Sequence, residues 1–338
     1  MKNKHMNIKR ILHRVKEEIT ATIKIARVTS IKEALVTFVA KCDIQIMNRN
    51  GYHESPKITR HLLKKHEVMI KYYEKTFGDF LENYNFKKAE NKSGGEDLSN
   101  VIWICWWQGL ENAPLLVKKC VQSIKKNARD HKVIILTDKN YKDYVTIPRW
   151  IEEKRNQGII TRTNYSDLLR LSLLAEHGGM WLDATFFCVN ANLDKYFKLP
   201  LWSIKRPDYG HVSVACGNFA GYSLYCNKDN RWIFSVIRDF FLHYWETNND
   251  MIDYLMIDYM IVLAQKHNKK IKKAFKEIPA NNPECDELYK LLNVPFDETK
   301  WNNMKKNTVL FKLSWKNHFK DESSKGKTFY GNLIDEKL

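Results

Sequence analysis

The stretch from Thr163 to Thr185 constrains the fold of this chain more than any other part of its sequence. It opens with a segment of helical length in which most residues between 168 and 175 are Leu or Ala, which predicts a helix buried almost all round. Gly178 and Gly179 then end the helix and turn the chain sharply into a short apolar strand. That strand places Asp183 at its carboxyl end, the edge at which open α/β sheets bind their ligands.

Strands and helices alternate on both sides of this stretch, which predicts a parallel sheet covered by helices. The expected strands are 101–107, 132–137 and 180–182, and the expected helices are 114–126, 148–157 and 164–177. The C-terminal half is mixed, with strands expected near 201–205, 212–216 and 308–313 and helices near 230–246, 252–267 and 284–292. The predicted class is therefore α/β.

Residues 1–95 differ from the rest and predict two or three amphipathic helices, whereas 96–338 form the predicted catalytic domain. Apolar residues recur at helical spacing in three stripes: Ile8 to Ala26, Ala34 to Cys42, and Ile58 to Phe80. Ser55-Pro56 is typical of a helix start, and the polar segment 91–97 is the expected domain boundary. Basic residues including Lys9, Arg10, Arg14 and Lys16 accompany the first stripe. The helices either pack on the catalytic domain or lay a basic face on anionic lipid, and both can hold.

The composition of the chain limits which binding partners and which cellular compartment are expected. A net charge of +17 favours an anionic partner, but no nucleic-acid-binding motif is present, so nucleic acid is not expected. Seven scattered cysteines predict neither a disulfide framework nor a zinc site. The sequence contains no apolar run of spanning length and no secretory signal. The expected location is the cytoplasm, peripheral on the inner face of the membrane.

Asp167, Arg170 and Asp183 are the candidate catalytic residues. Asp167 and Arg170 are three residues apart and share one face of a helix that is otherwise nearly apolar. A carboxylate at the end of the next strand can hold a divalent cation, which would neutralise a diphosphate leaving group. The alternative is a local ion pair worth about 0.2–0.5 kcal/mol and an aspartate that serves only a turn.

At these residues the chain resembles the capsular-polysaccharide-synthesis glycosyltransferases, relatives of glycosyltransferase family 32 and, more distantly, of the large clostridial glucosylating toxins. The resemblance covers roughly residues 100–330. It rests on Ile102-Trp103-Ile104 with Trp106-Trp107-Gln108-Gly109, on Ser166-Asp167-x-x-Arg170, on Gly178-Gly179-x-Trp181-Leu182-Asp183-Ala184-Thr185, on Asp253-Tyr254-x-x-x-Asp258-Tyr259, and on Lys312-Leu313-Ser314-Trp315-Lys316.

The resemblance implies a GT-A-like nucleotide-sugar-binding domain and retention of anomeric configuration. It implies that Trp103 lies against the nucleotide base, that Asp167 and Arg170 contact the donor sugar and diphosphate, and that Trp181 borders the donor. The full set implied to bind the nucleotide sugar is Trp103, Ile104, Trp106, Asp167, Arg170, Trp181, Leu182, Asn218, Asp258 and Trp315. Trp103 and Trp315 can alternatively be core residues, and Asp253 and Asp258 can both be solvated on a helix.

The motif departs from the Asp-x-Asp of many GT-A enzymes, because Thr185 occupies the third position. Asp183-Ala184-Thr185 resembles the form of the capsule-synthesis subgroup, so it does not imply an inactive site. A hydroxyl brings no charge and is a poorer ligand for Mn²⁺ or Mg²⁺ than a carboxylate. Asp183 and Thr185 are the expected metal ligands, with help from donor phosphates; otherwise metal dependence is weak. The sequence contains no H-E-x-x-H, Gly-x-Ser-x-Gly, Walker or Gly-x-Gly-x-x-Gly motif.

The predicted function is hexosyl transfer from a nucleotide-diphosphate sugar, UDP-linked for preference, to a growing surface polysaccharide or lipid-linked oligosaccharide. Two alternatives remain open. The first is a transferase that glycosylates a protein. The second is a module that binds a glycan or nucleotide without transferring a sugar, and Thr185 keeps this alternative open.

Overall fold

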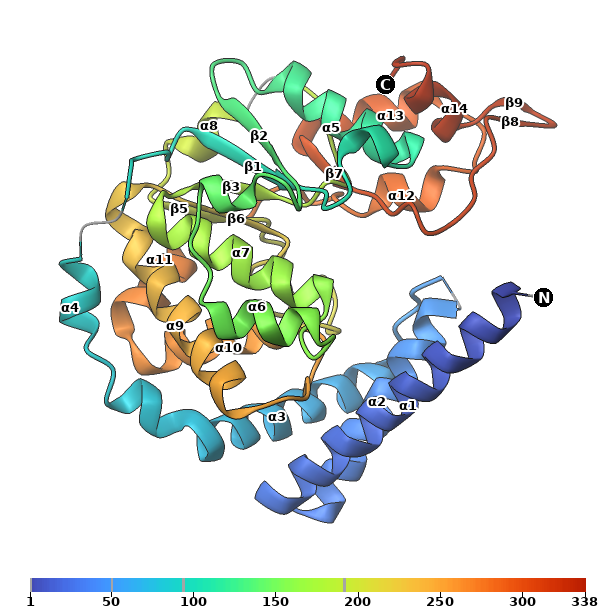
Figure 1. Ribbon diagram of the computed structural model, residues 1–338. Helices are drawn as coiled ribbons and strands as arrows, with labels where there is room; N and C mark the ends of the chain where they lie inside the picture. The colour runs from blue at the N-terminus through green and yellow to red at the C-terminus, as the bar shows by residue number, and fades with distance from the viewer. Residues whose placement is uncertain (1, 50, 93–94, 191–192) are drawn as a thin grey trace.

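Four helices precede the first strand in the computed structural model, which describes residues 2–49, 51–92, 95–190 and 193–338, with side chains omitted for 2–14 and 49. They are α1 (Lys2–Val28), α2 (Ile31–Arg49), α3 (Pro56–Glu82) and α4 (Phe86–Glu90). Ser55 caps α3 by accepting a hydrogen bond from the amide of Ile58, and Pro56 occupies its first turn, as the sequence predicts. In Figure 1, α1 and α2 form a hairpin that projects from the side of the molecule, and α3 runs from it beneath the body.

The centre of the molecule is a five-stranded sheet with strand order β2-β1-β3-β6-β5. Its strands are β1 (Val101–Cys105), β2 (Lys132–Leu136), β3 (Gly179–Leu182), β5 (Leu201–Ser203) and β6 (Ser223–Cys226). β1 pairs in parallel with both β2 and β3, whereas β6 runs antiparallel to β3 and β5. The sheet is therefore mixed, and its three parallel strands end at one edge.

Helices cover both faces of the sheet. α5 (Leu115–Asn127) lies on one side, and α6 (Arg149–Asn156), α7 (Arg162–Glu176) and α9 (Arg231–Thr247) lie on the other (Figure 1). α7 and α9 pack tightly together, and α10 (Met256–His267) and α11 (Lys269–Glu277) follow α9. Short elements connect these parts: η1 (Leu110–Asn112), η2 (Tyr141–Asp143), α8 (Asp194–Phe197) and η3 (Lys228–Asn230).

A second, smaller core gathers the C-terminal segment. β4 (Phe186–Cys188), which follows the Asp183 motif, pairs antiparallel with β7 (Leu310–Lys312). Around this pair lie α12 (Glu287–Leu291), α13 (Glu298–Asn307), the hairpin of β8 (Glu322–Ser323) and β9 (Gly326–Lys327), and α14 (Phe329–Ile334). Phe187, Phe311, Trp301 and Phe329 form the middle of this core. The pairing of β4 with β7 brings Lys312, which follows Thr185 by 127 residues, next to the motif.

The predicted α/β class is confirmed, and most expected elements are present within one to four residues of their predicted ends. The prediction of a parallel sheet holds only for β1, β2 and β3, because β6 runs antiparallel to both of its neighbours. The strand expected near 212–216 is wrong, because this segment forms turns with Ser213 bonded to Asp258. The short strands β4 and β6 and the helices α11, α13 and α14 are not among the elements expected from the sequence. The lysine-rich run at 269–273 forms α11, whose buried residues are Ile271 and Phe275.

The three apolar stripes of the N-terminal helices differ in how far they are buried. The stripe on α3 is buried as expected, with Leu62, Met69, Tyr73 and Phe77 in the interior. Among the described side chains of α1, Ala21 and Ile25 are buried, while Val15, Ile19 and Ile23 of the predicted stripe are about half exposed. On α2, Ala34 is buried, but Leu35, Phe38, Val39 and Cys42 are exposed. Ile8, Ile11 and Leu12, with Lys9, Arg10 and Arg14, lie outside the residues whose side chains are described, and 93–94 of the predicted linker lie outside the described chain.

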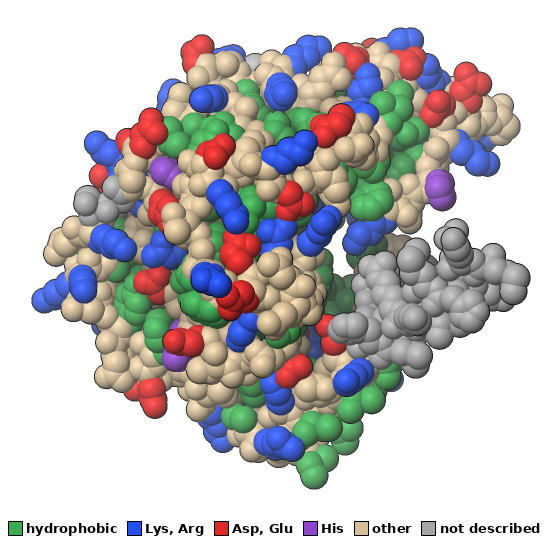
Figure 2. Space-filling model, viewed as in Figure 1, with side chains coloured by type: hydrophobic (Ala, Val, Ile, Leu, Met, Phe, Trp, Pro, Cys, Tyr) green, Lys and Arg blue, Asp and Glu red, His purple; other side chains and the backbone are tan. Residues whose placement is uncertain are grey.

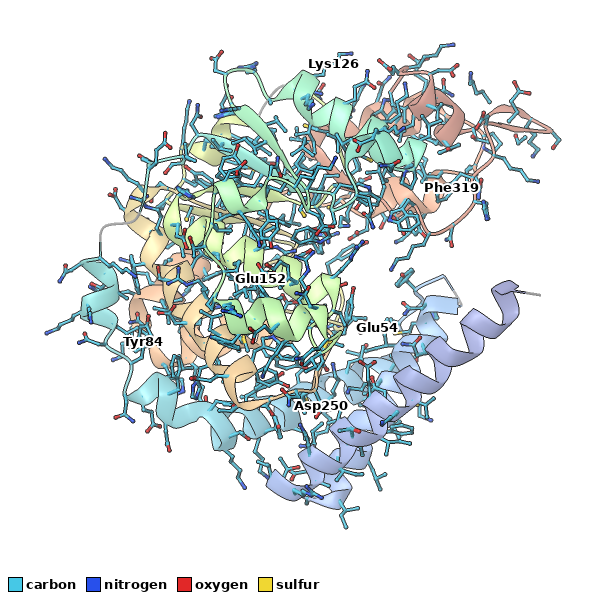
Figure 3. The ribbon with its side chains drawn as sticks, viewed as in Figure 1. Glu54, Tyr84, Lys126, Glu152, Asp250 and Phe319 are labelled. Carbon is cyan, nitrogen blue, oxygen red and sulfur yellow. The ribbon has the colours of Figure 1, made fainter. Side chains whose placement is uncertain are left out.

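The N-terminal helices are joined to the body by polar contacts as well as by packing. Asp250, which follows α9, forms an ion pair of 2.7 Å with Lys24 of α1, and the Tyr84 hydroxyl, just after α3, donates to Asp239 of α9. Figure 3 labels Asp250 beside the helical hairpin and Tyr84 at the far end of α3. Residues of α1 and α3 belong to the same continuous core as the sheet. The boundary at residue 95 stays a prediction.

None of the described helices is both long enough and apolar enough to cross a bilayer. All seven cysteines are free, as their scattered positions predict.

Candidate functional site

α7 carries two ionisable side chains into the interior. Thr161 caps the start of the helix, and its hydroxyl accepts a hydrogen bond from the amide of Asn164. The side chains of Asp167 and Arg170 are only 7% exposed, and Arg170 Nη1 lies 3.4 Å from Asp167 Oδ1. An exposed pair at this spacing would contribute a few tenths of a kcal/mol, but these charges are removed from water. The two side chains do form the local ion pair of the alternative, but the pair is buried, so the energy of an exposed pair does not describe it.

Two glycines make the turn from α7 into β3 possible. Gly178 and Gly179 have φ of 72° and 91°, a region that favours glycine. A Cβ at Gly179 would also lie 2.8 Å from the carbonyl oxygens of Leu98 and Val101. The tight turn brings the start of β3 against β1, so that Asp183 follows β3 at the edge where the parallel strands end.

Arg170 links the helix to the end of the strand. Its Nη2 lies 3.4 Å from Asp183 Oδ1, and its guanidinium carbon lies 4.9 Å from the centre of the Trp181 ring. Trp181 in turn donates its indole N–H to Asp183 Oδ1 over 3.1 Å. Trp181 is buried and Asp183 is 31% exposed. Arg170 thus stands between a buried carboxylate and one that reaches solvent.

A third carboxylate, Asp258 of α10, completes the surroundings of Arg170. It is buried and accepts a hydrogen bond of 2.6 Å from the Ser213 hydroxyl. A Cβ at Gly221 would lie 2.6 Å from Asp258 Oδ1 and 3.7 Å from Arg170 Nη1, so only glycine fits between them. The carbonyl of Gly221 also accepts from Arg170 Nη1. The alternative that Asp253 and Asp258 are both solvated is wrong, because Asp258 is buried here and Asp253 is buried against Lys65.

Burial makes two of these carboxyl groups hold their protons unusually tightly. It raises the pKa of Asp167 to about 7, although the Arg170 guanidinium opposes the shift. It raises the pKa of Asp258 to about 6, opposed by the hydrogen bond from Ser213 and by Arg170. Both groups therefore titrate near neutral pH, which is common for carboxyl groups at functional sites.

Lys312, the last residue of β7, contacts Asp183 and Thr185 and approaches the Asp183 oxygen that Arg170 does not contact. Its ammonium donates to the Thr185 hydroxyl over 2.6 Å and lies 3.4 Å from Asp183 Oδ2. The backbone fixes this approach, because Phe186 pairs with Lys312 and the amide of Leu313 donates to the carbonyl of Thr185. Asp183 is consequently flanked by two cations, Arg170 and Lys312.

Two tryptophans lie at the same edge. Trp106 follows β1 and meets Trp315, three residues after β7, with ring centres 5.9 Å apart and planes at 78°. Trp315 is 45% exposed, so it is not a core residue. Within the described part of the chain, Trp106 Nε1 and Arg170 Nε are buried donors without a hydrogen-bond partner. Unpaired buried donors are unusual, and a bound ligand would give them an acceptor.

Three of the predicted contact residues lie away from solvent. Trp103, Ile104 and Leu182 are fully buried, and the Trp103 indole donates to the carbonyl of Gly178 over 2.9 Å. A ring enclosed in the sheet offers no face to a base, so Trp103 is not placed for the contact that the resemblance implies. Asn218 is exposed on the loop that carries Ser213, and its amide donates to Ala215 of that loop.

A comparison with known protein families matches residues 49–333 to the model of the capsular polysaccharide synthesis protein family. The match includes Asp167, Arg170, Asp183, Asp258 and Lys312, and it covers most of the chain. The chain belongs to this family. Searches of curated proteins and of solved structures find no match. Membership in the capsular polysaccharide synthesis family supports a role in capsule biosynthesis. The matched range begins at residue 49, so α1 and nearly all of α2 lie outside it.

An open hollow of about 610 Å³ lies between the end of β2 and the start of α7. Asp138, Arg155, Thr161 and Arg162 are among its lining residues, and Arg155 stacks over the Tyr165 ring at 4.2 Å. Figure 3 labels Glu152 of its lining on α6. None of Asp167, Arg170 and Asp183 lines it, so we take the buried charge cluster, rather than this hollow, as the candidate site.

Sequence reasoning did not single out three residues of the site: Lys312, Ser213 and Gly221. Lys312 belongs to a segment that supports the resemblance, but no periodicity or spacing distinguishes it from the many other lysines. Ser213 and Gly221 lie on a loop, where nothing in the sequence indicates which side chain or carbonyl turns inward. The pairing of β4 with β7 and the packing of α10 bring all three into place.

The side chains at Asp183 fit a divalent metal poorly. Mg²⁺ prefers six oxygen ligands, of which the protein usually supplies one or two carboxylates. Asp183 Oδ1 already faces Trp181 and Arg170, its Oδ2 faces Lys312, and the Thr185 oxygen accepts from Lys312. Among the described residues, no group of three or more His, Cys, Asp or Glu side chains is placed to hold a metal ion.

Proposed function

We propose that this chain is a retaining glycosyltransferase with a GT-A-like catalytic domain. It takes a sugar from a nucleotide-diphosphate donor, UDP-linked in our proposal, and transfers it to a growing surface polysaccharide or a lipid-linked oligosaccharide. The observation that carries the proposal is Arg170, held among Asp167, Asp183 and Asp258 at the carboxyl edge of the parallel strands. Membership in the capsular polysaccharide synthesis family supports the acceptor class.

Each residue of the cluster has a role in this reaction. Arg170 stabilises the negative charge that develops on the departing diphosphate, and it does so in a site from which water is largely excluded. Asp167 accepts hydrogen bonds from donor-sugar hydroxyls and so fixes the orientation of the sugar. Trp106 and Trp315 offer aromatic surface to the nucleotide base at the same edge.

The proposed reaction is balanced without any further reactant. The bond between C1 of the sugar and the oxygen of the diphosphate breaks, and its electron pair stays on that oxygen. The acceptor hydroxyl oxygen bonds to C1 on the same face, and its proton passes to the departing diphosphate. The products are the glycosylated acceptor and the free nucleoside diphosphate.

The test is hydrolysis or transfer with a panel of nucleotide sugars, using the full chain. At least one donor should turn over, and Arg170→Lys should reduce turnover by about 10²–10³-fold because the point charge of lysine does not reproduce the guanidinium fork. Arg129→Ala is the matched control, since Arg129 forms an exposed ion pair with Asp194 elsewhere on the molecule. Full turnover by Arg170→Lys, or no turnover and no binding of any nucleotide, would contradict the proposal.

The acceptor distinguishes the proposal from its alternatives. We place the reaction at the cytoplasmic face of the membrane, where lipid-linked oligosaccharides present their growing ends. Mass added to a polypeptide, with none added to lipid-linked glycans, would instead identify a protein-glycosylating enzyme. Donor binding without any hydrolysis or transfer would identify a non-catalytic module.

A further inference from the structure

We propose that the ammonium group of Lys312 carries the positive charge at the Asp183 end of the site, in place of a divalent metal ion. The inference rests on the proposed function, because it assigns the residue that meets the diphosphate of the donor. It gives a physical reason for the Thr185 position, at which a carboxylate is replaced by a hydroxyl.

The geometry of Lys312 is set by backbone as well as by side chains. β7 is anchored on β4, and the amide of Lys312 itself donates to the carbonyl of Cys285 over 2.7 Å. From this position the side chain crosses the rings of Phe186 and Tyr222, with Nζ 5.8 Å and 5.4 Å from their centres. It ends 2.6 Å from the Thr185 oxygen. The ammonium is therefore held at a defined point beside Asp183.

The chemistry of the neighbours explains why Thr185 suits a lysine better than a metal. An ammonium has three donors and needs acceptors around it, which a hydroxyl and one carboxylate supply. A second carboxylate at Thr185 would add negative charge, as a divalent ion requires. Here Lys312 and Arg170 already flank the one carboxylate that reaches solvent, and they would repel a divalent ion.

The same arrangement suits a diphosphate. Lysine is a common phosphate ligand because its ammonium acts as a compact point charge. Lys312 is 20% exposed at its side chain, so it can present a free donor to an anion while it remains bonded to Thr185. With Lys312 and Arg170 on either side, Asp183 positions two cations, and these stabilise the negative charge that develops on the diphosphate oxygen as it keeps the electron pair of the broken bond to C1.

The experiment combines metal removal with substitution of Lys312 in the full chain. Donor hydrolysis and UDP binding by the wild type should change less than twofold between excess chelator and a titration of Mn²⁺ or Mg²⁺. Lys312→Met should lower turnover by about 10²-fold and weaken UDP binding, in chelator and in metal alike. Lys312→Arg should recover part of both, because it restores the charge.

The controls separate chemistry from folding. Lys306→Met removes an exposed lysine of α13, which contacts Asn303 and lies outside the charge cluster, and it should leave both measurements unchanged. A thermal melt of each variant shows whether the chain is folded. If Lys312→Met unfolds, metal independence of the wild type and the response of Lys312→Arg still test the inference.

Each outcome bears on one proposal or on both. Wild-type activity that is lost in chelator and restored by Mn²⁺ overturns the role of Lys312 and leaves the glycosyltransferase proposal standing. Normal turnover and normal UDP affinity in Lys312→Met would also overturn the role of Lys312 and leave the glycosyltransferase proposal standing. UDP binding that is metal-independent and weakened in Lys312→Met supports the inference even if hydrolysis is slow. A chain that neither binds UDP nor hydrolyses any donor contradicts both.

Discussion

Asp167 and Asp258 show how a single residue's surroundings set its chemistry. An aspartate in water is ionised at neutral pH, but burial raises the pKa of Asp167 to about 7 and that of Asp258 to about 6. Both groups hold protons more tightly in the folded chain than in the unfolded one. Their contribution to the free energy of unfolding is therefore fully present below about pH 4 and is lost as the pH rises through 6 to 7.

The first prediction concerns proton uptake on UDP binding. A bound diphosphate adds negative charge beside Asp167 and Asp258, so it should raise both pKa values further, and UDP should bind more tightly as the pH falls from 8 to 6. Calorimetry in buffers of different ionisation enthalpy should show that protons are taken up near pH 7. Asp167→Asn, which cannot titrate, should reduce this uptake. Affinity that does not vary with pH would show that the two carboxyls do not sense the ligand.

The second prediction distinguishes the role of Trp103, which lies in β1, from that of Trp106, which follows β1. Trp106→Ala should weaken UDP binding by about 1–3 kcal/mol, because stacking on an aromatic ring contributes about that much per base. Trp103→Phe should instead lower the melting temperature, since it removes the hydrogen bond to Gly178 and buried ring area, while UDP affinity of the folded variant stays close to normal. Normal UDP affinity in Trp106→Ala, together with weakened affinity in folded Trp103→Phe, would instead indicate that Trp103 contacts the base.

At the scale of elements, the α1–α2 hairpin presents an apolar face to solvent. Eight apolar side chains of α1 and α2 are between 39% and 73% exposed: Val15, Ile19, Ile23, Ile31, Leu35, Phe38, Val39 and Ile46. Figure 2 shows green side chains at the lower end of the hairpin, where the two helices join. An open hollow of about 520 Å³ lies on α2 between Ile31, Leu35 and Val39. Surfaces of this kind mark interaction sites.

Charge indicates what covers this face. Lys16 and Arg27 are exposed at helical spacing from Ile19 and Ile23, and Lys32 is exposed beside Leu35, on a chain with a net charge of +17. Apolar side chains flanked by cations are typical of helices that lie in an anionic membrane interface. We therefore propose an anionic lipid surface as the partner of this hairpin, which would hold the site close to a lipid-linked acceptor.

The third prediction tests this surface. Substitution of Ile19, Ile23, Leu35 and Val39 by Ser should release the protein from phosphatidylglycerol vesicles in a co-sedimentation assay, while donor hydrolysis persists. Leu115→Ser on α5 is the matched control, because Leu115 is 49% exposed on another part of the molecule. Unchanged sedimentation, or a dimer in light scattering that the four substitutions dissociate, would assign the face to something other than lipid.

At the scale of the whole molecule, a buried ion pair ties α3 to the loop before α10. Lys65 Nζ lies 2.7 Å from Asp253 Oδ2, and both side chains are 4% exposed or less. Burial alone would raise the pKa of Asp253, but Lys65 and Lys41 outweigh it and hold this pKa below its ordinary value. The pair therefore contributes to stability above about pH 4, and this contribution is lost as the pH falls below that value.

The fourth prediction concerns this pair and the cooperativity of unfolding. Lys65→Met should lower the free energy of unfolding by about 3–5 kcal/mol, because it leaves Asp253 charged and buried without its partner. The double variant Lys65→Met, Asp253→Asn should recover much of the loss. Urea unfolding followed by circular dichroism and by tryptophan fluorescence should show one transition, since α3 and the sheet share one core. Two separate transitions would show that the N-terminal helices unfold independently.

The sequence by itself determined what local physical chemistry decides. The apolar stretch around Asp167 and Arg170 predicts a buried helix, Gly178 and Gly179 predict the sharp turn from this helix into β3, and Asp183 follows that short strand. Ser55 and Pro56 likewise determined where α3 begins. Each of these rests on residues within one turn or one strand, so the pattern alone contains the information.

Only the tertiary structure decided which distant groups meet. Trp103 and Trp106 belong to the same apolar run, so the sequence does not show which of them is buried. The pairing of β1 with two neighbouring strands buries Trp103 and leaves Trp106 at the edge of the sheet. Lys312 resembles every other lysine until β7 pairs with β4 and brings it to Thr185. The stripe on α1 has helical spacing, yet Ala21 and Ile25 form the buried face, because contact with the rest of the molecule selects the side that packs. Periodicity shows that a helix has an apolar face, and only the fold shows what that face meets.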